Sequence, residues 1–274
     1  MQANMNSRYR ISSLDKGLKV LSCFTPQRRQ IGASEVARLS GIPVSTVYRI
    51  LRTLVDSGFV EQLEDGNFTP GVGVLKLGFA ALQGNEVVEA ASGPLKELRR
   101  STGETCNLGV LSGGDLVYLL RYKTAHYVIG NVSVGSSLAA TCTAMGKTLL
   151  AMLEPEELSS VLAGMDLTRA GVGPHAHRTT ETLMPDLAKI RQRGWAMQDE
   201  EVAHGLRAIA LPVRNLDGVV AAVGISVEGA RWPRDRMTAE LLDALRETAQ
   251  KVSLRLGYLE GVAPSRRPGL DSSA

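Results

Sequence analysis

Residues 34–58 read SEVARLSGIPVSTVYRILRTLVDSG, and this stretch decides the fold of the first third of the chain. Ser34 is placed to cap a short helix, and Gly41 follows that helix where a left-handed residue is favoured. Pro43 prevents the helix from continuing, and a longer helix is expected to start near Ser45. Two helices joined by a short turn that contains glycine form a helix-turn-helix.

The longer helix has a polar face opposite an apolar stripe, which consists of Val47, Leu51, Leu54 and Val55. The polar face begins with small hydroxyl groups, and a tyrosine and arginines follow. This order suits a helix in the major groove of DNA, with small donors near base edges and cations along the flank. For this helix taken alone, a solvated amphipathic helix is the alternative. The expected DNA-binding residues are Ser34, Pro43, Ser45, Thr46, Tyr48, Arg49, Arg52 and Thr53.

The residues before this stretch predict a first amphipathic helix, capped by Ser12 or Ser13 and ending near Phe24. Its apolar stripe is expected to consist of Leu14, Leu18 and Leu21.

The residues after this stretch predict a hairpin. Two β-prone segments at 59–63 and 67–69 flank Glu64-Asp65-Gly66, and Asp-Gly between such segments is a strong hairpin signal. The acidic tip gives the hairpin a lesser role in phosphate contact. Helix, short helix, turn, longer helix and hairpin is the order of a winged helix-turn-helix that reads double-stranded DNA, which we expect over residues 11–73.

The whole chain has 274 residues, of which 44% are hydrophobic and 22% are charged, so we expect a folded globular protein of two domains. Residues 1–85 hold ten Lys and Arg against six Asp and Glu, whereas the rest hold 21 against 22, so the basic part contains the helix-turn-helix. Three cysteines without a C-x-x-C pair indicate a reduced compartment. Because there is also no long apolar segment, we expect a cytoplasmic protein without membrane contact.

Residues 74–85 form an expected connector helix with an apolar stripe of Val74, Leu75, Gly78, Phe79 and Leu82. A second copy of the same helix is the economical partner, because the paired half-sites of a palindromic operator match a two-fold symmetric protein. We therefore expect a homodimer. Docking of the stripe on its own domain is the alternative.

Residues 86–260 alternate strand and helix signals. Hairpin signals occur at residues 112–115 and 215–218, and helices are expected before Gly103, before Gly194 and after residue 240. Hairpins imply an antiparallel sheet with helices beside it, so the predicted fold class is α+β. The two ends, residues 1–10 and 261–274, are expected to be disordered.

Motifs of catalysis are incomplete in this second domain. Gly146-Lys147-Thr148 lacks the earlier glycine of a phosphate-binding loop, which is Thr141 here, and the segment 224–228 is not a nucleophile elbow. We therefore expect no catalytic residue, no cofactor and no metal. A metal site is disfavoured because Gly- and Pro-rich loop sequence surrounds the histidines concerned, which are His175, His177 and His204.

Two segments of the second domain carry chemistry that suits a ligand. Thr141 or Thr143 would cap an apolar helix over residues 148–153, and the small residues at its start leave N–H groups open to an anion such as a carboxylate. An ordinary capped helix packed under the sheet is the alternative. The acidic segment at residues 199–201 forms either an exposed turn or part of a pocket.

Several segments of the DNA-binding third resemble the IclR-type bacterial transcriptional regulators, and the likeness continues along the chain to about Leu259. The segments that carry it are Ser13-Leu14, residues 18–21, Phe24, residues 36–43 and residues 45–51. The resemblance implies a GAF-like effector-binding domain over residues 86–260, and dimers or dimers of dimers. The expected effector-binding residues are Tyr127, Cys142, Thr143, Ala144, Met145, Asp199, Arg207, Ala208, Gly224 and Ser226.

Residues 131–136, 142–146 and 205–213 look most like the branch of this family that controls protocatechuate, p-hydroxybenzoate and β-ketoadipate catabolism. This likeness implies an aromatic or dicarboxylic acid effector. Ala208 and Gly224 stand where some relatives have Cys and Ser, which leaves a roomier and less polar pocket. Arg207 either neutralises the carboxylate of the effector or pairs with Glu200 or Glu201.

The sequence therefore predicts a DNA-binding transcriptional regulator that responds to a small organic acid. There are two alternatives. One is a constitutive DNA binder whose second domain only oligomerises, and the other is an enzyme with a DNA-binding appendage.

Overall fold

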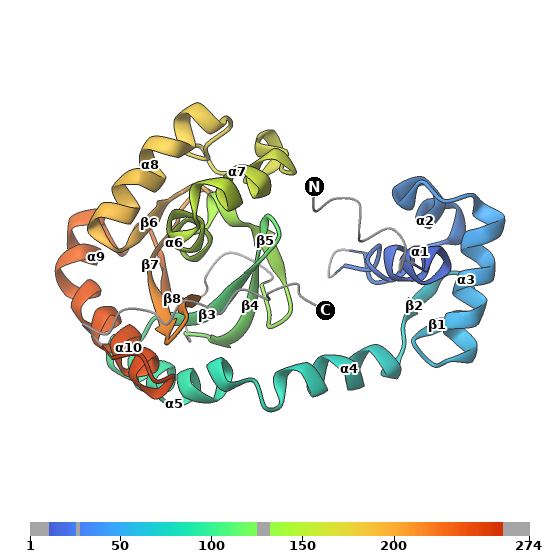
Figure 1. The fold of residues 1–274 in the computed structure, drawn as a ribbon, viewed down its shortest axis with the longest axis horizontal. Helices are drawn as coiled ribbons and strands as arrows, with labels where there is room; N and C mark the ends of the chain where they lie inside the picture. The colour runs from blue at the N-terminus through green and yellow to red at the C-terminus, as the bar shows by residue number, and fades with distance from the viewer. Residues whose placement is uncertain (1–10, 26–27, 125–131, 260–274) are drawn as a thin grey trace, which may run out of the picture. The chain divides into compact units, whose positions relative to one another are not determined.

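The computed structural model describes residues 11–25, 28–124 and 132–259. Their contacts divide the chain into two units, the first ending at Gln83 and the second starting at Gly84 (Figure 1). Each unit has its own buried core. The predicted disordered ends and Tyr127 lie outside the described residues.

Unit 1 is a helix-turn-helix followed by a hairpin and one further helix. Its elements are α1 (Ser12–Leu21), α2 (Ala33–Ser40), α3 (Val44–Asp56), β1 (Val60–Gln62), β2 (Phe68–Pro70) and α4 (Val72–Leu82). Gly41 ends α2 in the left-handed conformation, with φ at 68°. β1 and β2 pair antiparallel around a turn that contains Gly66, also at positive φ. The winged helix-turn-helix is therefore confirmed.

The core of unit 1 lies where the first three helices meet the hairpin. Val47 and Leu51 of α3 are fully buried, as their spacing predicts. Phe68 of β2 is buried too, and its backbone exchanges hydrogen bonds with Ile31, which precedes α2. This pairing extends the hairpin by a third backbone segment. The sequence does not predict it, because Ile31 stands alone among polar and small residues.

The first two helices differ from the prediction. α1 has no side-chain cap and ends at Leu21 rather than near Phe24. Its fully buried side chain is Val20, whereas Leu14 and Leu18 are more than half exposed, because the core of unit 1 lies on the side that carries Val20. Gly32 is the N-cap residue of α2, so the predicted cap at Ser34 is wrong.

Unit 2 is a six-stranded antiparallel sheet with helices on both faces, which confirms the α+β class. In the sheet the strands follow the order β5-β4-β3-β8-β7-β6. They are β3 (Thr105–Ser112), β4 (Asp115–Tyr122), β5 (Ser137–Ala139), β6 (Ala196–Asp199), β7 (Leu206–Asn215) and β8 (Gly218–Glu228). The helices are α5 (Glu86–Thr102), α6 (Ala144–Met152), α7 (Pro155–Ala163), α8 (Thr180–Arg193), α9 (Arg234–Glu240) and α10 (Leu242–Arg255).

The two faces of this sheet are covered by different helices. On one face, side chains such as Ile225 and Val227 of β8 pack with the apolar residues of α5 and α10. Alternate residues point the other way, and there Ala210 and Ala222 pack with the start of α6. Figure 1 shows α5 and α10 on one side of the strands and α6 on the other. We call the second side the α6 face.

Several elements of unit 2 are shorter or start earlier than the sequence predicts. β5 and β6 are edge strands of three and four residues, too short to give a periodic signal. The helices α7 and α9 are likewise not predicted. α6 starts at Ala144 rather than at Thr148, and Thr143 caps it by accepting a hydrogen bond from the N–H of Gly146 (3.0 Å). Within the described ranges, the helices are too short or too polar to span a bilayer.

Candidate functional site

The polar face of α3 points away from the core of unit 1. Ser45, Tyr48 and Arg49 are exposed, and Thr46 is half-buried. Among the described residues no side chain caps the start of α3, so N–H groups of its first turn remain available to an anion. α3 therefore offers hydroxyl and backbone donors at its start and a cation one turn later.

The hairpin holds part of this face in place. Arg52 donates a hydrogen bond from Nη1 to Oε1 of Gln62 in β1 (3.1 Å). The ring of Tyr48 meets the buried ring of Phe68 edge to face, with centroids 6.5 Å apart. Both contacts tie α3 to the hairpin and leave the outer edge of Tyr48 free.

The remaining predicted DNA-binding residues have few partners. Ser34 and Pro43 are exposed, and the hydroxyl of Thr53 donates to the backbone carbonyl of Arg49 (3.0 Å). In the part of the chain that the structure describes, the guanidinium of Arg49 has neither a hydrogen bond nor an ion pair. Arg49 is therefore the cation of α3 most available to a polyanion.

In unit 2, several residues expected to border an effector lie together on the α6 face. Ala208 of β7 is directly opposite Ser226 of β8. Gly224 lies two positions earlier on β8 and is covered by Met145, because a Cβ added to this glycine would lie 3.0 Å from Cγ of Met145. Ala144 belongs to the same buried cluster as Met145.

Two polar residues that sequence reasoning missed belong to the same face. Arg121 of β4 donates from Nη1 to Oδ1 of Asn107 in β3 (2.9 Å), and Asn107 donates from Nδ2 to Oγ of Ser226 in β8 (3.1 Å). This hydrogen-bond chain crosses three neighbouring strands. A signal for Asn107 exists in the sequence, since it is the polar residue at an inward position of the otherwise apolar segment 106–111.

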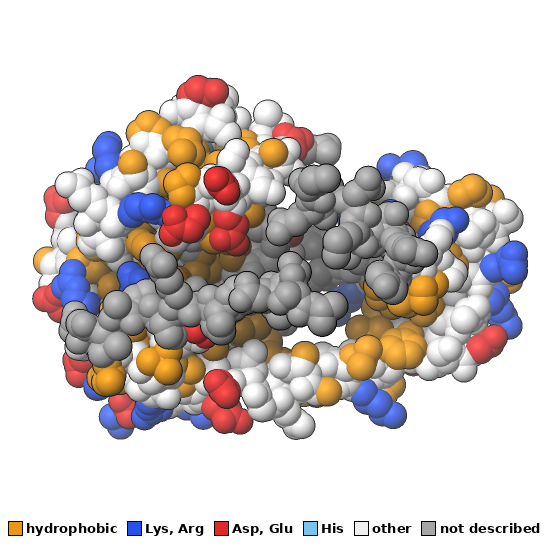
Figure 2. All heavy atoms as spheres, in the orientation of Figure 1, with side chains coloured by type: hydrophobic (Ala, Val, Ile, Leu, Met, Phe, Trp, Pro, Cys, Tyr) orange, Lys and Arg blue, Asp and Glu red, His pale blue; other side chains and the backbone are white. Residues whose placement is uncertain are grey.

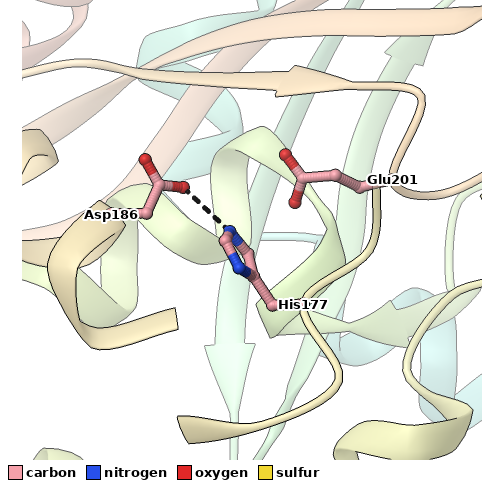
Figure 3. Close-up of side chains that lie close together, drawn as sticks. All are labelled: His177, Asp186 and Glu201. Atoms are coloured by element: carbon pink, nitrogen blue, oxygen red, sulfur yellow. Dashed lines mark hydrogen bonds and ion pairs between the residues drawn. The ribbon is translucent and has the colours of Figure 1, made fainter. Parts of the chain in front are cut away.

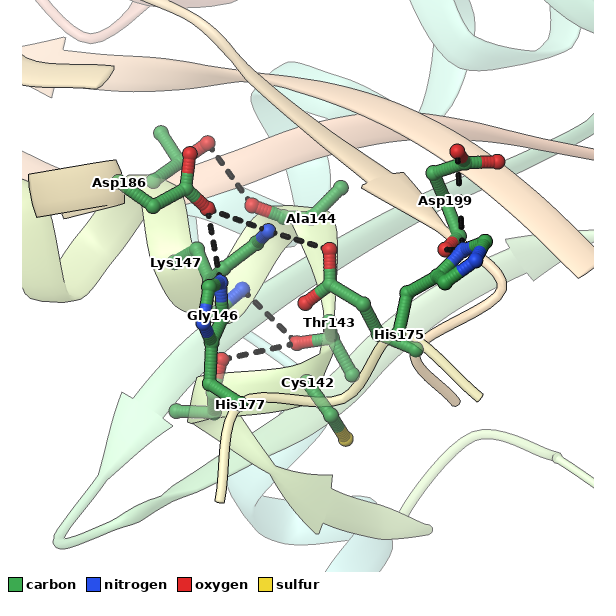
Figure 4. Close-up of polar contacts among 12 residues, drawn as sticks. Cys142, Thr143, Ala144, Gly146, Lys147, His175, His177, Asp186 and Asp199 are labelled. Carbon is green, nitrogen blue, oxygen red and sulfur yellow. Dashed lines mark hydrogen bonds and ion pairs between the residues drawn. The ribbon is translucent and has the colours of Figure 1, made fainter. Parts of the chain in front are cut away.

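The start of α6 is closely packed (Figure 4). A Cβ on Gly146 would lie 2.3 Å from the carbonyl oxygen of Ala140, and all residues from 140 to 151 are buried. Cys142 donates from Sγ to the carbonyl of Ala139 (3.2 Å), and burial raises the pKa of its thiol to about 12. Cys142 is therefore a neutral thiol at pH 7. An anion at the first turn of α6 stays a prediction.

Lys147 of α6 is buried between two carboxylates. Its Nζ lies 2.5 Å from Oε1 of Glu201 and 2.7 Å from Oδ2 of Asp186. Burial raises the pKa of Glu201, and Lys147 opposes this rise only in part. Burial also acts on Asp186, but hydrogen bonds from His177 and Lys147 outweigh it and lower the pKa of this carboxyl. One ammonium group thus joins α6 to α8 and to the segment after β6.

The same cluster has the composition of a metal site but is already occupied by a cation. His177, Asp186 and Glu201 place ligand atoms within 4.8 Å of one another (Figure 3). Lys147 contacts both carboxylates, so a metal ion there would face its positive charge. Two further histidines of the described chain have different partners, which are the backbone carbonyl of Asp199 for His175 and the carboxylate of Glu200 for His204. We therefore describe the cluster as an ion-pair network.

The acidic segment at the end of β6, residues 199–201, is not an exposed turn. Asp199 pairs with Arg207 at 2.5 Å and with Arg234 at 3.0 Å. Glu200 adopts a positive φ of 57° and accepts a hydrogen bond from the N–H of Gly205 (3.0 Å). Glu201 points instead to Lys147, whereas Asp199 and Glu200 both pair with Arg207.

Arg207 is fully engaged by unit 2. Its guanidinium pairs with Asp199 and Glu200 and donates to the carbonyl oxygens of Gly229 (2.6 Å) and Trp232 (3.2 Å). Of the two alternatives for Arg207, the structure favours the ion pair, with Glu200 but not with Glu201. Its side chain has little capacity left for a carboxylate ligand.

The comparisons with known proteins agree along the chain. The family model described as the IclR helix-turn-helix domain matches residues 13–64, and the model described as the bacterial transcriptional regulator IclR C-terminal matches residues 79–254. The HTH-type transcriptional regulator XynR of Escherichia coli is 32% identical over 250 residues, which are 90% of this chain and 98% of that protein. The Pca regulon regulatory protein of Pseudomonas putida is 31% identical over 238 residues, covering 86% and 80%.

Solved structures show the same fold. The IclR of Thermotoga maritima superposes with a TM-score of 0.66 at 27% identity and covers 91% of this chain and 100% of its own. An IclR homolog from Microbacterium hydrocarbonoxydans, complexed with 4-hydroxybenzoate, superposes with a TM-score of 0.73 at 25% identity and covers 90% and 99%.

Proposed function

The chain belongs to the IclR family of bacterial transcriptional regulators, and on this premise we propose that it acts as a homodimer whose binding to a palindromic operator is controlled by an aromatic carboxylic acid. Family membership makes it a DNA-binding transcriptional regulator and not an enzyme. The observation that carries the DNA-binding half is the face of α3, where Val47 and Leu51 are buried while Ser45, Tyr48 and Arg49 stay exposed.

Two lines of support point to an aromatic acid. The α6 face carries a cation, Arg121, and the polar groups of Asn107 and Ser226 beside apolar and small residues that include Ala208 and Ala210. Among the similar proteins are a regulator named for the Pca regulon and a homolog complexed with 4-hydroxybenzoate. Such a surface suits a flat apolar ring with one carboxylate, because ligand sites are mostly apolar with a few placed polar groups.

The proposal is tested with DNA that the wild-type protein selects from a random pool. The affinity of the full chain for this DNA is measured by gel shift with and without 4-hydroxybenzoate and protocatechuate. We expect at least one acid to change the affinity and to release or absorb heat on binding to the free protein. If neither acid changes the affinity for the selected DNA and neither releases or absorbs heat, the proposed control by an aromatic acid is wrong. The protein would then be a constitutive DNA binder.

Arg49→Ala is expected to weaken binding to the selected DNA by about 1–3 kcal/mol, or roughly 5- to 150-fold, because it removes the unpaired cation of α3. Competition by scrambled DNA distinguishes its two possible contacts. A base contact predicts relaxed preference at one position, and a phosphate contact predicts a uniform loss with a shallower salt dependence. Arg246→Ala, an exposed arginine of unit 2, is the matched control. Unchanged affinity of the Arg49 variant removes this residue from the interface.

Dimerisation through α4 is the second part of the proposal. α4 has no buried residue in the described chain, and Val72, Leu75, Leu77 and Phe79 are all more than half exposed. Figure 2 shows hydrophobic side chains along α4. Apolar side chains exposed in such number mark a surface that is covered in the functional protein. Leu75 and Phe79 are four residues apart and lie on one side of the helix.

Leu75→Glu combined with Phe79→Glu is expected to convert the dimer into a monomer at micromolar concentration, because two charges would face their copies across the symmetric interface. Sedimentation equilibrium measures the mass. Operator affinity should also fall by about 100-fold or more, since the two half-sites are then bound independently. Lys76→Glu makes the same change in net charge at a polar position of α4 and should remain dimeric. A double variant with the mass of the wild type would assign the interface to another surface.

A further inference from the structure

We propose that Arg121 and Gln198 hold the two ends of the effector, and that this effector is a monocarboxylic acid with a hydrogen-bonding group at the end opposite its carboxylate. The inference rests on the proposed function, because it assumes that the α6 face binds an acid. It goes further by assigning one residue to each end of that acid.

Arg121 is the first of the two residues. Its Nη1 is oriented by Asn107, which is oriented in turn by Ser226. Its Nε is buried without a hydrogen-bond partner, and in the described part of the chain no carboxylate forms an ion pair with its guanidinium. A half-buried guanidinium with a buried, unpaired Nε is unfavourable without an anion, and the carboxylate of a ligand would supply that anion. Arg207, by contrast, is fully paired by Asp199 and Glu200.

The environment of Arg121 suits an aromatic acid. Its guanidinium carbon lies 6.0 Å from the centroid of the buried ring of Tyr118. Burial lowers the pKa of Arg121, although a guanidinium remains charged throughout the physiological range. A planar guanidinium with a free edge binds a carboxylate through two donors, which fixes the direction in which the rest of the acid extends.

Gln198 is the second residue and lies across the sheet from Arg121. It is fully buried in β6, and both its Oε1 and its Nε2 lack a hydrogen-bond partner. Its register partner is Ala208, whose partner on the next strand is Ser226, so Gln198 belongs to the α6 face with the hydrogen-bond chain from Arg121. Two unpaired atoms on one buried amide are costly, and a hydroxyl or carbonyl group of a ligand satisfies them.

The separation of the two residues sets the length of the ligand. Arg121 lies on β4 and Gln198 on β6, which is four strand spacings away in the order β4-β3-β8-β7-β6. At about 4.8 Å for each spacing, the two strands are about 19 Å apart along the sheet, and the long side chains of Arg121 and Gln198 reach inward from both ends. A substituted benzene ring fills the remaining span, whereas a two-carbon acid does not. The small side chains of Ala208 and Ser226 lie between the two ends and are only half-buried.

The test uses the full-length protein and three probes that differ by one group. 4-Hydroxybenzoate has both ends, benzoate lacks the hydroxyl, and 4-hydroxybenzyl alcohol lacks the carboxylate. Calorimetry measures each dissociation constant for the wild type, Arg121→Gln, Arg121→Lys and Gln198→Leu. Arg100→Gln, an exposed arginine of α5, is the control for the loss of a guanidinium.

We expect Arg121→Gln to weaken the binding of 4-hydroxybenzoate and of benzoate by about 100-fold or more, and to leave the binding of the alcohol almost unchanged. Arg121→Lys keeps the charge, so it should fold like the wild type. It should still bind the two acids about tenfold more weakly, because one ammonium does not replace the paired donors of a guanidinium. Gln198→Leu should weaken the binding of 4-hydroxybenzoate by about tenfold or more without changing the binding of benzoate. A loss of fold would affect all three probes equally, so this pattern separates ligand contact from a structural role.

The outcomes also separate this inference from the proposed function. If the wild type binds an acid and the Arg121 variants bind it equally well, the assignment of Arg121 is wrong while the acid-controlled regulator stands. If Gln198→Leu leaves the preference for the hydroxyl intact, the assignment of Gln198 is wrong. If the wild type binds its selected DNA but none of the three probes, both this inference and the aromatic effector class are overturned.

Discussion

Lys147→Met is expected to lower the free energy of unfolding of unit 2 by about 3–5 kcal/mol, because it leaves the buried carboxylate of Glu201 without its cation. Asp186 loses the same partner but keeps its contact with His177. Both tryptophans of the chain, Trp195 and Trp232, lie in unit 2, so their fluorescence during urea unfolding reports this unit alone.

The pH dependence of the stability of the same variant gives a second and independent prediction. Burial already raises the pKa of Glu201, and Lys147 opposes that rise, so removing the lysine raises the pKa further. The folded variant then binds more protons than the unfolded chain above pH 4.5, the ordinary value for this carboxyl. Its stability should therefore increase as the pH falls from 7 to 5.

Two variants serve as controls for Lys147→Met. Lys189→Met removes an exposed lysine of α8 and should change the stability by less than about 0.5 kcal/mol. Adding Glu201→Gln to Lys147→Met removes the buried charge as well and should recover part of the loss. If Lys147→Met unfolds at the urea concentration of the wild type, the ion-pair network does not stabilise unit 2.

Phe68→Ala should destabilise unit 1 by about 3–5 kcal/mol, since it opens a cavity at the buried ring that joins α3 to the hairpin. The tryptophan fluorescence of unit 2 should be unaffected, so hydrogen exchange of the amides of α2 and α3 is the measurement. DNA binding should be lost in parallel, because Tyr48 loses the ring against which it packs.

Phe68→Leu keeps most of the volume and should lose less than about 1.5 kcal/mol. Leu39→Ala truncates a partly exposed apolar residue of α2 and should have a smaller effect than Phe68→Ala. Faster hydrogen exchange in unit 1 for Leu39→Ala than for Phe68→Ala would contradict the conclusion that the ring of Phe68 stabilises this unit by joining α3 to the hairpin.

The elements of unit 1 can be predicted from the sequence because the signals are local. Gly41 and Pro43 lie within the stretch that they shape, and the spacing of Val47 and Leu51 marks the buried side of α3. The buried side of α1 is not a local property. Leu14 and Leu18 have the spacing of a core stripe, yet packing in three dimensions buries Val20 instead.

The chemistry of unit 2 is less predictable, since its contacts join residues that are far apart in the sequence. Thr143 is recognisable as a cap because it bonds to Gly146, three residues away. The bond from Asn107 to Ser226 spans 119 positions, and its partners meet only because β3 pairs with β8. An arginine on a strand, such as Arg121, looks like any surface cation until the register is known.

The pairing of β3 with β8 in the middle of the sheet has a consequence for synthesis on the ribosome. Ser226 follows its partner Thr105 by 121 positions (226 minus 105). At a synthesis rate of about 5–20 residues per second, β8 therefore becomes available to pair with β3 about 6–24 s after β3 is made. Unit 1 is complete long before then. The nascent chain therefore completes its helix-turn-helix while the sheet of unit 2 is still unfinished, and during that interval the unpaired edge of β3 is a target for chaperones.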